Sequence, residues 1–229
     1  MEAVRRGQLR SREPSTRPNA GRRIIRDLVR RTLLLPIAVL LATPAGGFVI
    51  DISQGNPVVL YLQVGTGSFS GLYSTGGTPQ GNPTVNVVSV TVPSAALLTG
   101  ADQQMTSNST QAVSFYDGRV FCSPPDQVYI GGFFRRPGQP RFQSAVLTVD
   151  VPPALVSPAG DTIPFSQIRW TSSGLDAVPD GAFVAGGTQF IADFYRNTWR
   201  ESCLTFYYLN DPAAAGTYQG RVTYTLTAP

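Results

Sequence analysis

The side chains that most enzymes use as nucleophile and base are scarce in this chain of 229 residues. It contains no histidine, which excludes a Ser–His pair and every metal site that needs an imidazole ligand. Its two cysteines, Cys122 and Cys203, are too few for a structural zinc site. No G-x-S-x-G sequence, phosphate-binding glycine loop or acidic calcium-loop pattern occurs. We therefore expect a non-enzymatic protein without a metal or cofactor.

Paired carboxylates are the remaining route to hydrolytic chemistry. Glu201 is the only glutamate after residue 45, and Asp176, Asp180 and Asp193 are close to it in the sequence. Glycoside hydrolysis needs two carboxyl groups that face one cleft. Acidic residues in turns are more often solvated, so we expect these four side chains to be exposed. A carboxylate-based hydrolase is therefore the least favoured function.

The richest polar and aromatic stretch extends from Phe194 to Cys203. Within it, Tyr195 and Trp199 could combine with Trp170 to form a platform on which sugar rings stack, while neighbouring polar side chains supply hydrogen bonds. The favoured alternative is that Trp170 or Trp199 packs in the core against a disulfide, as aromatic residues do in β-sandwiches. The first interpretation predicts a carbohydrate-binding module with a glycan as its partner.

A second candidate binding element is the basic loop that contains Arg135, Arg136 and Arg141. Guanidinium groups bind carboxylates and phosphates through paired donors, so this loop could grip an anionic glycan or a lipid headgroup. The simpler interpretation, which we favour, is a solvated loop interrupted by Pro137 and Pro140.

Charge is distributed unevenly along the chain. The formal net charge is +4, but residues 1–31 hold ten of the 18 basic residues and three of the 14 acidic ones. The rest of the chain keeps eight basic and eleven acidic side chains, a balance near −3. Binding to nucleic acid requires a net basic face, so we expect no nucleic-acid partner.

An apolar run from Thr32 to Ala45 follows Arg30 and Arg31 and ends in small residues. A membrane-spanning helix needs about 20 apolar residues, so this run is too short to span a bilayer. A basic flank, a short apolar core and small residues are the parts of a secretory signal, and we expect cleavage after Ala45; the alternative is a buried core helix. We expect residues 1–45 to be removed, leaving no membrane span. Residues 46–229 would form one exported domain in the periplasm, at the cell surface or outside the cell.

Export determines the redox state that we expect for the two cysteines. Thiols pair in an oxidising compartment, so we expect a disulfide between Cys122 and Cys203. The loop that it closes is long, and the chain-entropy model assigns such a bridge about 4 kcal/mol of stabilisation. The alternative is a pair of free, buried thiols.

Apolar residues in 46–229 alternate with a period of two, which is typical of half-buried strands. With no convincing long helix, this pattern predicts a single all-β domain of about nine antiparallel strands, an immunoglobulin-like or pilin-like β-sandwich. The expected inward-facing sets are Phe48, Ile50 and Ile52; Val58, Leu60, Leu62 and Val64; Ala145, Leu147, Val149 and Val151; Phe165, Ile168 and Trp170; Phe190, Ala192 and Phe194; Leu204, Phe206 and Tyr208; and Tyr218, Gly220, Val222, Tyr224 and Leu226.

Three local patterns predict how the strands are connected. Residues 65–83 are rich in Gly, Ser and Thr and are expected to form a long surface loop. The valines in residues 85–92 change face, which predicts either a bulge at positions 87–88 or a strand buried on both faces. The dipeptide Asp117-Gly118 lies between alternating segments and predicts a hairpin whose two turn residues have positive φ.

The C-terminal segment from Gly216 to Pro229, GTYQGRVTYTLTAP, resembles the final strand of pilin-like subunits of bacterial chaperone–usher systems, including the spore-coat-U type. In those families a glycine begins an alternating final strand, and Gly216 matches it, whereas Ala228 stands in place of the penultimate aromatic residue. The ending is also similar to the close of Gram-positive wall-binding WxL domains, with Tyr224 at the tryptophan position. The resemblance covers this strand and the general pattern of signal, cysteine pair and strands.

The resemblance to pilin-like subunits implies assembly by strand donation, in which an extended N-terminal segment completes the sheet of another subunit. Phe48, Ile50 and Ile52 would be the donor residues, with identical or related subunits and a periplasmic chaperone as partners. The alternative is that these residues form an ordinary first strand in their own domain. We therefore expect an exported structural or adhesive surface subunit, with a secreted carbohydrate-binding module as the alternative function.

Overall fold

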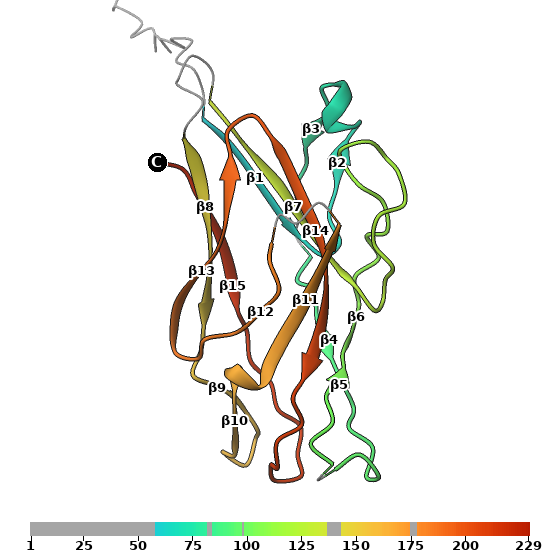
Figure 1. The fold of residues 1–229 in the computed structure, drawn as a ribbon, viewed down its shortest axis with the longest axis vertical. Coiled ribbons are helices and arrows are strands. Elements are labelled where there is room, and N and C mark those ends of the chain that lie inside the picture. The colour runs from blue at the N-terminus through green and yellow to red at the C-terminus, as the bar shows by residue number, and fades with distance from the viewer. Residues whose placement is uncertain (1–57, 82–83, 98, 137–142, 175–177) are drawn as a thin grey trace, which may run out of the picture. The chain divides into compact units, whose positions relative to one another are not determined.

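The computed structural model describes residues 58–81, 84–97, 99–136, 143–174 and 178–229, all of which lie in one compact unit, Ile52–Pro229 (Figure 1). The expected leader and signal, residues 1–45, lie outside the described residues, as do the expected donor residues Phe48, Ile50 and Ile52. Within the described part, strands dominate and the only helices are two 3-10 turns, Tyr73–Thr75 and Phe165–Gln167. The expected all-β class with antiparallel sheets is confirmed.

The larger sheet has six strands in the order β1-β7-β14-β11-β12, with β5 paired to one end of β14. Every pairing in it is antiparallel. The long strand β14 lies between β7 and β11, so it is the centre of this sheet. The strands are β1 (Val59–Val64), β5 (Gln103–Gln104), β7 (Val128–Arg135), β11 (Ile168–Gly174), β12 (Gly181–Ala182) and β14 (Trp199–Tyr208).

The second main sheet has three strands in the order β13-β8-β15, and three small strand pairs complete the described part. Its strands are β8 (Ser144–Val151), β13 (Gly187–Tyr195) and β15 (Thr223–Thr227). The small pairs are β2 (Phe69–Ser70) with β3 (Thr78–Pro79), β4 (Val88–Ser89) with β6 (Thr106–Ser107), and β9 (Ala154–Val156) with β10 (Thr162–Pro164). The described residues thus contain fifteen strand segments, eight of them only two or three residues long, so the expected count of nine is not confirmed.

A main hydrophobic core joins the inner faces of the two sheets, an arrangement consistent with a β-sandwich (Figure 1). The alternation in β8 is confirmed, because Ala145, Leu147 and Val149 have no exposed surface while Asp150 faces solvent. Leu204 and Phe206 of β14 are buried on the opposing sheet. Period-two patterns therefore placed the central strands correctly.

A second hydrophobic cluster covers the outer face of the larger sheet. Its buried members include Tyr61, Tyr129, Phe133 and Trp199, together with both cysteines. Phe69 and Tyr73, from the stretch expected to be a surface loop, pack against this cluster, so residues 65–83 cover the sheet. Consequently β7 is buried on both faces along seven of its eight residues.

The expected orientation of β1 toward the main core is confirmed for Leu62 and Val64, but the second cluster makes the opposite face the better covered one. Leu62 and Val64 are only half-buried against the main core, and Leu60 is exposed. Tyr61 and Gln63, which were expected to face away, are the buried residues, with 7% and 1% exposure. Alternation identifies the two faces of a strand but not which face is better covered when both have a neighbour.

The expected hairpin at Asp117-Gly118 forms, but its turn has a different geometry from the one expected. The hairpin at Asp117-Gly118 is confirmed by the bridge between Val113 and Val120, but only Gly118 has positive φ among its turn residues. The loop closes with hydrogen bonds from the Ser114 amide to the Arg119 carbonyl and from the Gly118 amide to the Ser114 carbonyl. The chain therefore reverses through a wider loop than a two-residue turn.

The valines of residues 85–92 need neither a bulge nor burial on both faces. Val85 and Val87 are exposed, while Val88, Val90 and Val92 pack against the main core, which is ordinary alternation. The bulge lies instead in β13, where the register shifts between Phe190 and Ala192. Phe190 was expected inside but is 59% exposed, because this shift turns it to the solvent face.

Candidate functional site

One side of the domain, here called the flank, lies between β1 and β15, which are an edge strand of the larger sheet and an edge strand of the three-stranded sheet. Among the described residues, β1 pairs only with β7, and β15 pairs only with β8. The two edge strands approach each other on this side of the domain. An unpaired strand edge leaves backbone N–H and C=O groups that can bind another extended segment.

Apolar side chains along this flank are only half-buried. Leu62 and Val64 of β1 and Tyr224 and Leu226 of β15 all pack against the main core without being enclosed by it. Val222, just before β15, is half-buried in the same way, and the alternation expected for the last strand is confirmed. The core is therefore less completely covered here than at the centre of β8.

The stacking platform of Trp170, Tyr195 and Trp199 is not formed. Trp170 is 4% exposed in the main core beside Phe183, whereas Trp199 is 6% exposed in the second cluster. Their indole nitrogens are satisfied inside the protein, since Trp170 Nε1 donates to the Pro179 carbonyl at 2.8 Å. The two residues lie in separate clusters, so the prediction of a joint sugar platform was wrong. Core packing of a tryptophan near the disulfide, the favoured alternative, is confirmed for Trp199.

Basic residues lie over aromatic rings at the end of β7 and between the adjoining ends of β13 and β14. The Arg135 guanidinium lies over the Tyr73 ring, 5.3 Å from its centroid, and the Arg200 guanidinium lies 5.1 Å from the centroid of the exposed Tyr195 ring. Arg136 is half-buried, and Arg141 is outside the described residues. Binding of an anionic group by Arg135, Arg136 and Arg141 therefore stays a prediction.

Glu201 is a buried carboxylate that the sequence had placed in solvent. It is 2% exposed and accepts three hydrogen bonds, from Ser114 Oγ at 2.7 Å, Tyr129 Oη at 2.8 Å and Trp199 Nε1 at 2.8 Å. Burial first, and the Glu201 carboxylate second, raise the pKa of Tyr129, which keeps this phenol a proton donor. The expectation of a solvated acid was wrong. A usable signal existed, because Glu201 shares its face of β14 with Trp199 and Cys203.

The Glu201 network acts together with the disulfide. Cys122 and Cys203 lie at disulfide-bonding distance, with Cα atoms 5.5 Å apart, as expected. Ser114 belongs to the 113–120 hairpin, and Cys122 lies two residues after the end of that hairpin. One covalent bond and one hydrogen bond therefore attach this hairpin to β14 across the second cluster.

Of the remaining acids, Asp180 and Asp193 lie among the described residues, and each accepts a local hydrogen bond. The Asp180 carboxylate accepts a hydrogen bond from the Ser172 amide at 2.6 Å, and Asp193 accepts one from Ser144 Oγ at 3.1 Å. Asp176 lies outside the described residues. Within the described ranges, no three or more Cys, Asp or Glu side chains are grouped as metal ligands would be. Asp180 and Asp193 therefore support local structure.

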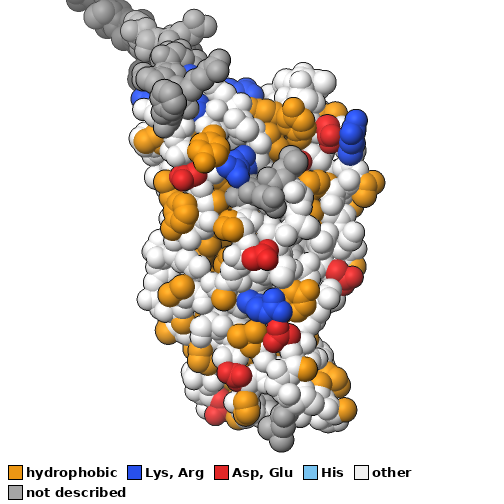
Figure 2. Space-filling model, viewed as in Figure 1, with side chains coloured by type: hydrophobic (Ala, Val, Ile, Leu, Met, Phe, Trp, Pro, Cys, Tyr) orange, Lys and Arg blue, Asp and Glu red, His pale blue; other side chains and the backbone are white. Residues whose placement is uncertain are grey.

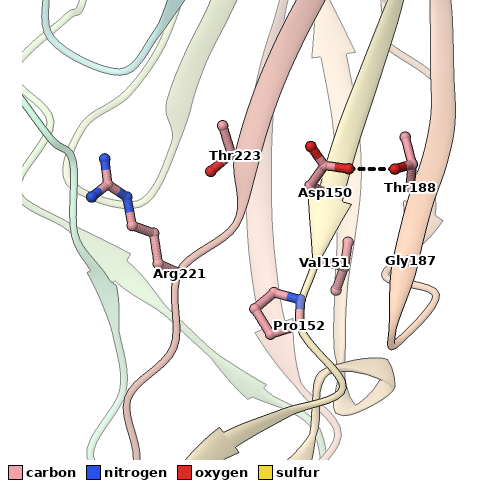
Figure 3. A pocket seen from close by; sticks show the side chains of 7 residues that line it. All are labelled: Asp150, Val151, Pro152, Gly187, Thr188, Arg221 and Thr223. Carbon is pink, nitrogen blue, oxygen red and sulfur yellow. Dashed lines mark hydrogen bonds between the residues drawn. The ribbon is translucent and has the colours of Figure 1, made fainter.

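A cavity of about 340 Å³ opens on the outer face of the three-stranded sheet (Figure 3). Its polar lining comes from Asp150 on β8, Thr188 on β13, Thr223 on β15 and Arg221 just before β15. Thr188 Oγ1 donates a hydrogen bond to Asp150 Oδ1. Sequence reasoning missed this site, because its residues come from three strands whose pairing the sequence does not show.

Comparisons with known proteins add no relative to this picture. No protein-family model matches the sequence, and no match was found among curated proteins or solved structures. In the part of the chain that the structure describes, no helix is both long and apolar enough to cross a membrane.

Proposed function

We propose that this protein is an exported, non-enzymatic surface subunit with an immunoglobulin-like or pilin-like β-sandwich, which joins other copies by strand addition. The observation that carries the proposal is the flank between β1 and β15. There two sheet edges without a strand partner among the described residues lie beside half-buried apolar side chains. An added strand would pair with an edge and cover these side chains in one step.

The N-terminal segment before β1 has the composition of such a strand. Phe48, Ile50 and Ile52 alternate with Val49 and Asp51, so an extended segment would present three apolar side chains on one side. These residues directly follow the proposed cleavage point after Ala45. In the proposal they occupy the flank of a second copy, and before assembly a periplasmic chaperone covers that flank.

The disulfide and the charge balance support the exported setting. A bridge between Cys122 and Cys203 is stable in an oxidising compartment such as the periplasm or the cell exterior. Residues 46–229 carry a net charge near −3, which does not favour nucleic acid. The structural or adhesive role and the surface location follow from this setting and from strand addition.

The test is complementation between two variants of the purified protein. The donor variant carries Ile50→Asp and Ile52→Asp, and the acceptor variant carries Leu226→Asp, which places a charge in the flank. We expect the wild-type protein to form chains of copies in native mass spectrometry, and each variant alone to stay monomeric. Mixing the two should produce dimers, because one intact donor then meets one intact flank.

A matched control carries Ser53→Asp and Asn56→Asp, which add two charges near the donor without changing its apolar residues. This control should assemble as the wild type does. The proposal fails if the wild type stays monomeric at high concentration. It also fails if hydrogen exchange shows residues 48–52 firmly paired within their own domain.

A further inference from the structure

The chain contains a single Asp–Pro sequence, Asp211-Pro212, and it lies in the exposed segment that follows β14. An Asp–Pro peptide bond is more labile in acid than other peptide bonds, for two reasons. The aspartate carboxyl group can attack the carbonyl carbon of its own residue, and the proline nitrogen, which belongs to a tertiary amide, leaves more easily than the nitrogen of a secondary amide. The contacts of the carbonyl oxygen and of the carboxylate decide whether the fold assists this reaction.

A tyrosine hydroxyl donates to the carbonyl oxygen of this bond. Tyr208, the last residue of β14, donates from Oη to the Asp211 carbonyl at 3.1 Å. Burial first, and the Asp211 carboxylate second, raise the pKa of Tyr208, so the phenol stays a proton donor. A fixed donor at a carbonyl oxygen stabilises the negative charge that develops there when a nucleophile attacks the carbon.

The Asp211 carboxylate is also held in place. Gln167 Nε2 donates to Asp211 Oδ2 at 2.6 Å, and Oδ1 has no hydrogen-bond partner among the described residues. Tyr208, Gln167, Asp211 and Pro212 all line a cavity of about 180 Å³, which is far larger than the roughly 15 Å³ that one water molecule requires. A carboxylate, a donor to the carbonyl oxygen and space for water therefore meet at one peptide bond.

The chain is anchored immediately before this bond. Asn210 is 3% exposed, and its Nδ2 donates to the Ala96 carbonyl at 2.7 Å. Asn210 also has a positive φ of 60°, a conformation that is uncommon outside glycine and that recurs at functional sites. The Leu209 amide donates to the Gln167 carbonyl at 2.9 Å, so Gln167 contacts both the backbone before Asp211 and the Asp211 side chain. These contacts hold Asp211 beside Tyr208.

We propose that Asp211-Pro212 is a self-cleavage site, at which the fold accelerates the acid-dependent breakage of the peptide bond. In the first step, Oδ1 of the protonated Asp211 carboxyl group forms a bond to the Asp211 carbonyl carbon and closes a five-membered cyclic anhydride. The bond from that carbon to the Pro212 nitrogen breaks, and the nitrogen takes up the carboxyl proton. Water then adds to the anhydride, so one water molecule is consumed. Asp211 is left with its side-chain carboxyl group and a new C-terminal carboxyl group.

Cleavage would divide the chain without removing a strand from its sheet. Residues 212–229 contain β15, which is paired with β8 along its whole length. Tyr218 and Leu226, from the same segment, pack against the main core. After cleavage the last strand is therefore a separate peptide that only non-covalent contacts hold in place. The inference does not depend on strand addition and stands if that proposal fails.

Incubation of the purified full chain in mild acid tests the proposal. The pH is the lowest, near about 4 to 5, at which circular dichroism shows the protein folded, and intact-mass spectrometry measures the rate of cleavage. We expect residues 212–229 to be released from the chain about tenfold or more faster in the folded protein than in the same protein unfolded in urea at that pH, because unfolding removes the Tyr208 hydrogen bond. Native mass spectrometry should show the fragment still bound. Asp211→Asn should give no product in the same time, since it lacks the attacking carboxyl group.

Tyr208→Phe isolates the contribution of the hydroxyl. We expect cleavage of this folded variant to be about tenfold or more slower than that of the folded wild type, and the two rates to be equal in urea. Tyr218→Phe is the matched control, because Tyr218 Oη donates to the Ala214 carbonyl at 2.7 Å in the same segment, at a bond that is not cleaved. It should be cleaved as the wild type is. Melting temperatures show that both variants are folded.

Other results overturn the inference. These are cleavage of the folded wild type that is no faster than cleavage in urea, or cleavage of folded Tyr208→Phe at the wild-type rate. An equal loss of rate in Tyr218→Phe and Tyr208→Phe also overturns it. Cleavage of Asp211→Asn at the wild-type rate would show that the carboxyl group is not the nucleophile.

Discussion

The Glu201 carboxylate is stabilised by neutral donors alone. Burying a carboxylate is costly unless hydrogen bonds replace its water, and here a hydroxyl, a phenol and an indole do so. Two of the donors, Tyr129 and Trp199, are themselves buried in the second cluster. Each would lose its own partner if the carboxylate were removed.

Replacing Glu201 should therefore destabilise the fold by more than the loss of its side-chain volume alone would. We expect Glu201→Ala to lower the free energy of unfolding by about 3 kcal/mol, because three buried donors lose their acceptor. Glu201→Gln should cost less, because its amide oxygen still accepts. Urea unfolding measures both, with Asp126→Ala as the exposed control expected within about 0.5 kcal/mol of the wild type. Equal losses in Glu201→Ala and Asp126→Ala would contradict this role.

The raised pKa of Tyr61 predicts how the free energy of unfolding changes at alkaline pH. Burial raises the pKa of Tyr61 to about 12, whereas a tyrosine in an unfolded chain has a pKa of about 10. A folded pKa above the unfolded one leaves stability intact below about pH 10 and lowers it as the pH rises toward 12. We expect Tyr61→Phe to flatten this alkaline loss, measured by urea unfolding at a series of pH values. Parallel pH profiles for the two proteins would rule this cause out.

At the scale of elements, the disulfide fixes the 113–120 hairpin and its neighbours to β14. The bridge joins residues 81 positions apart, and a cross-link over so long a loop restricts the unfolded chain strongly. The hairpin is also held by the Ser114 bond to Glu201 and by hydrogen bonds that the amides of Tyr73 and Ser74 donate to the carbonyls of Phe115 and Tyr116. Oxidation of the cysteines therefore adds a covalent link to a hairpin that hydrogen bonds also hold in place.

Loss of the disulfide should cost about 4 kcal/mol. The double variant Cys122→Ser with Cys203→Ser should unfold at a lower urea concentration than the oxidised protein, by an amount that corresponds to this loss. A reducing agent should lower the stability of the wild type and leave the double variant unchanged. Identical unfolding of the oxidised and reduced wild type would show that the bridge contributes nothing.

The elements that the sequence predicts well are those with one covered face. In β8 only one face meets the core, so the pattern of Ala145, Leu147 and Val149 identified that face directly. In β1 both faces have neighbours, and the better cover comes from residues 65–83, whose Gly-rich composition suggested a loop. Phe190 was misplaced because a bulge changes parity without a clear sign in the residue types.

At the scale of the whole domain, the features that the sequence does not predict are those that depend on which distant strands pair. The cysteine pair was predictable because only two cysteines exist, and the last strand because its alternation is clean. Sheet order and register determine that β1 lies near β15 and that Asp150 lies between Thr188 and Thr223. The alternation of apolar residues is compatible with other orders and registers, so the sequence does not predict these neighbours.

The space-filling view shows acidic, basic and apolar side chains interspersed over this face of the domain, with no single sign of charge prevailing (Figure 2).

The covalent link between Cys122 and Cys203 also has a mechanical consequence. A pulling force applied at the two ends of the chain passes through the bridge and bypasses the polypeptide between those cysteines, which includes β7, β8, β11 and β13. At about 3.5 Å per extended residue, the 81-residue separation represents roughly 280 Å of contour length that tension cannot release. A subunit that carries load between neighbours would in this way yield only at its outer segments while most of both sheets stays unstretched.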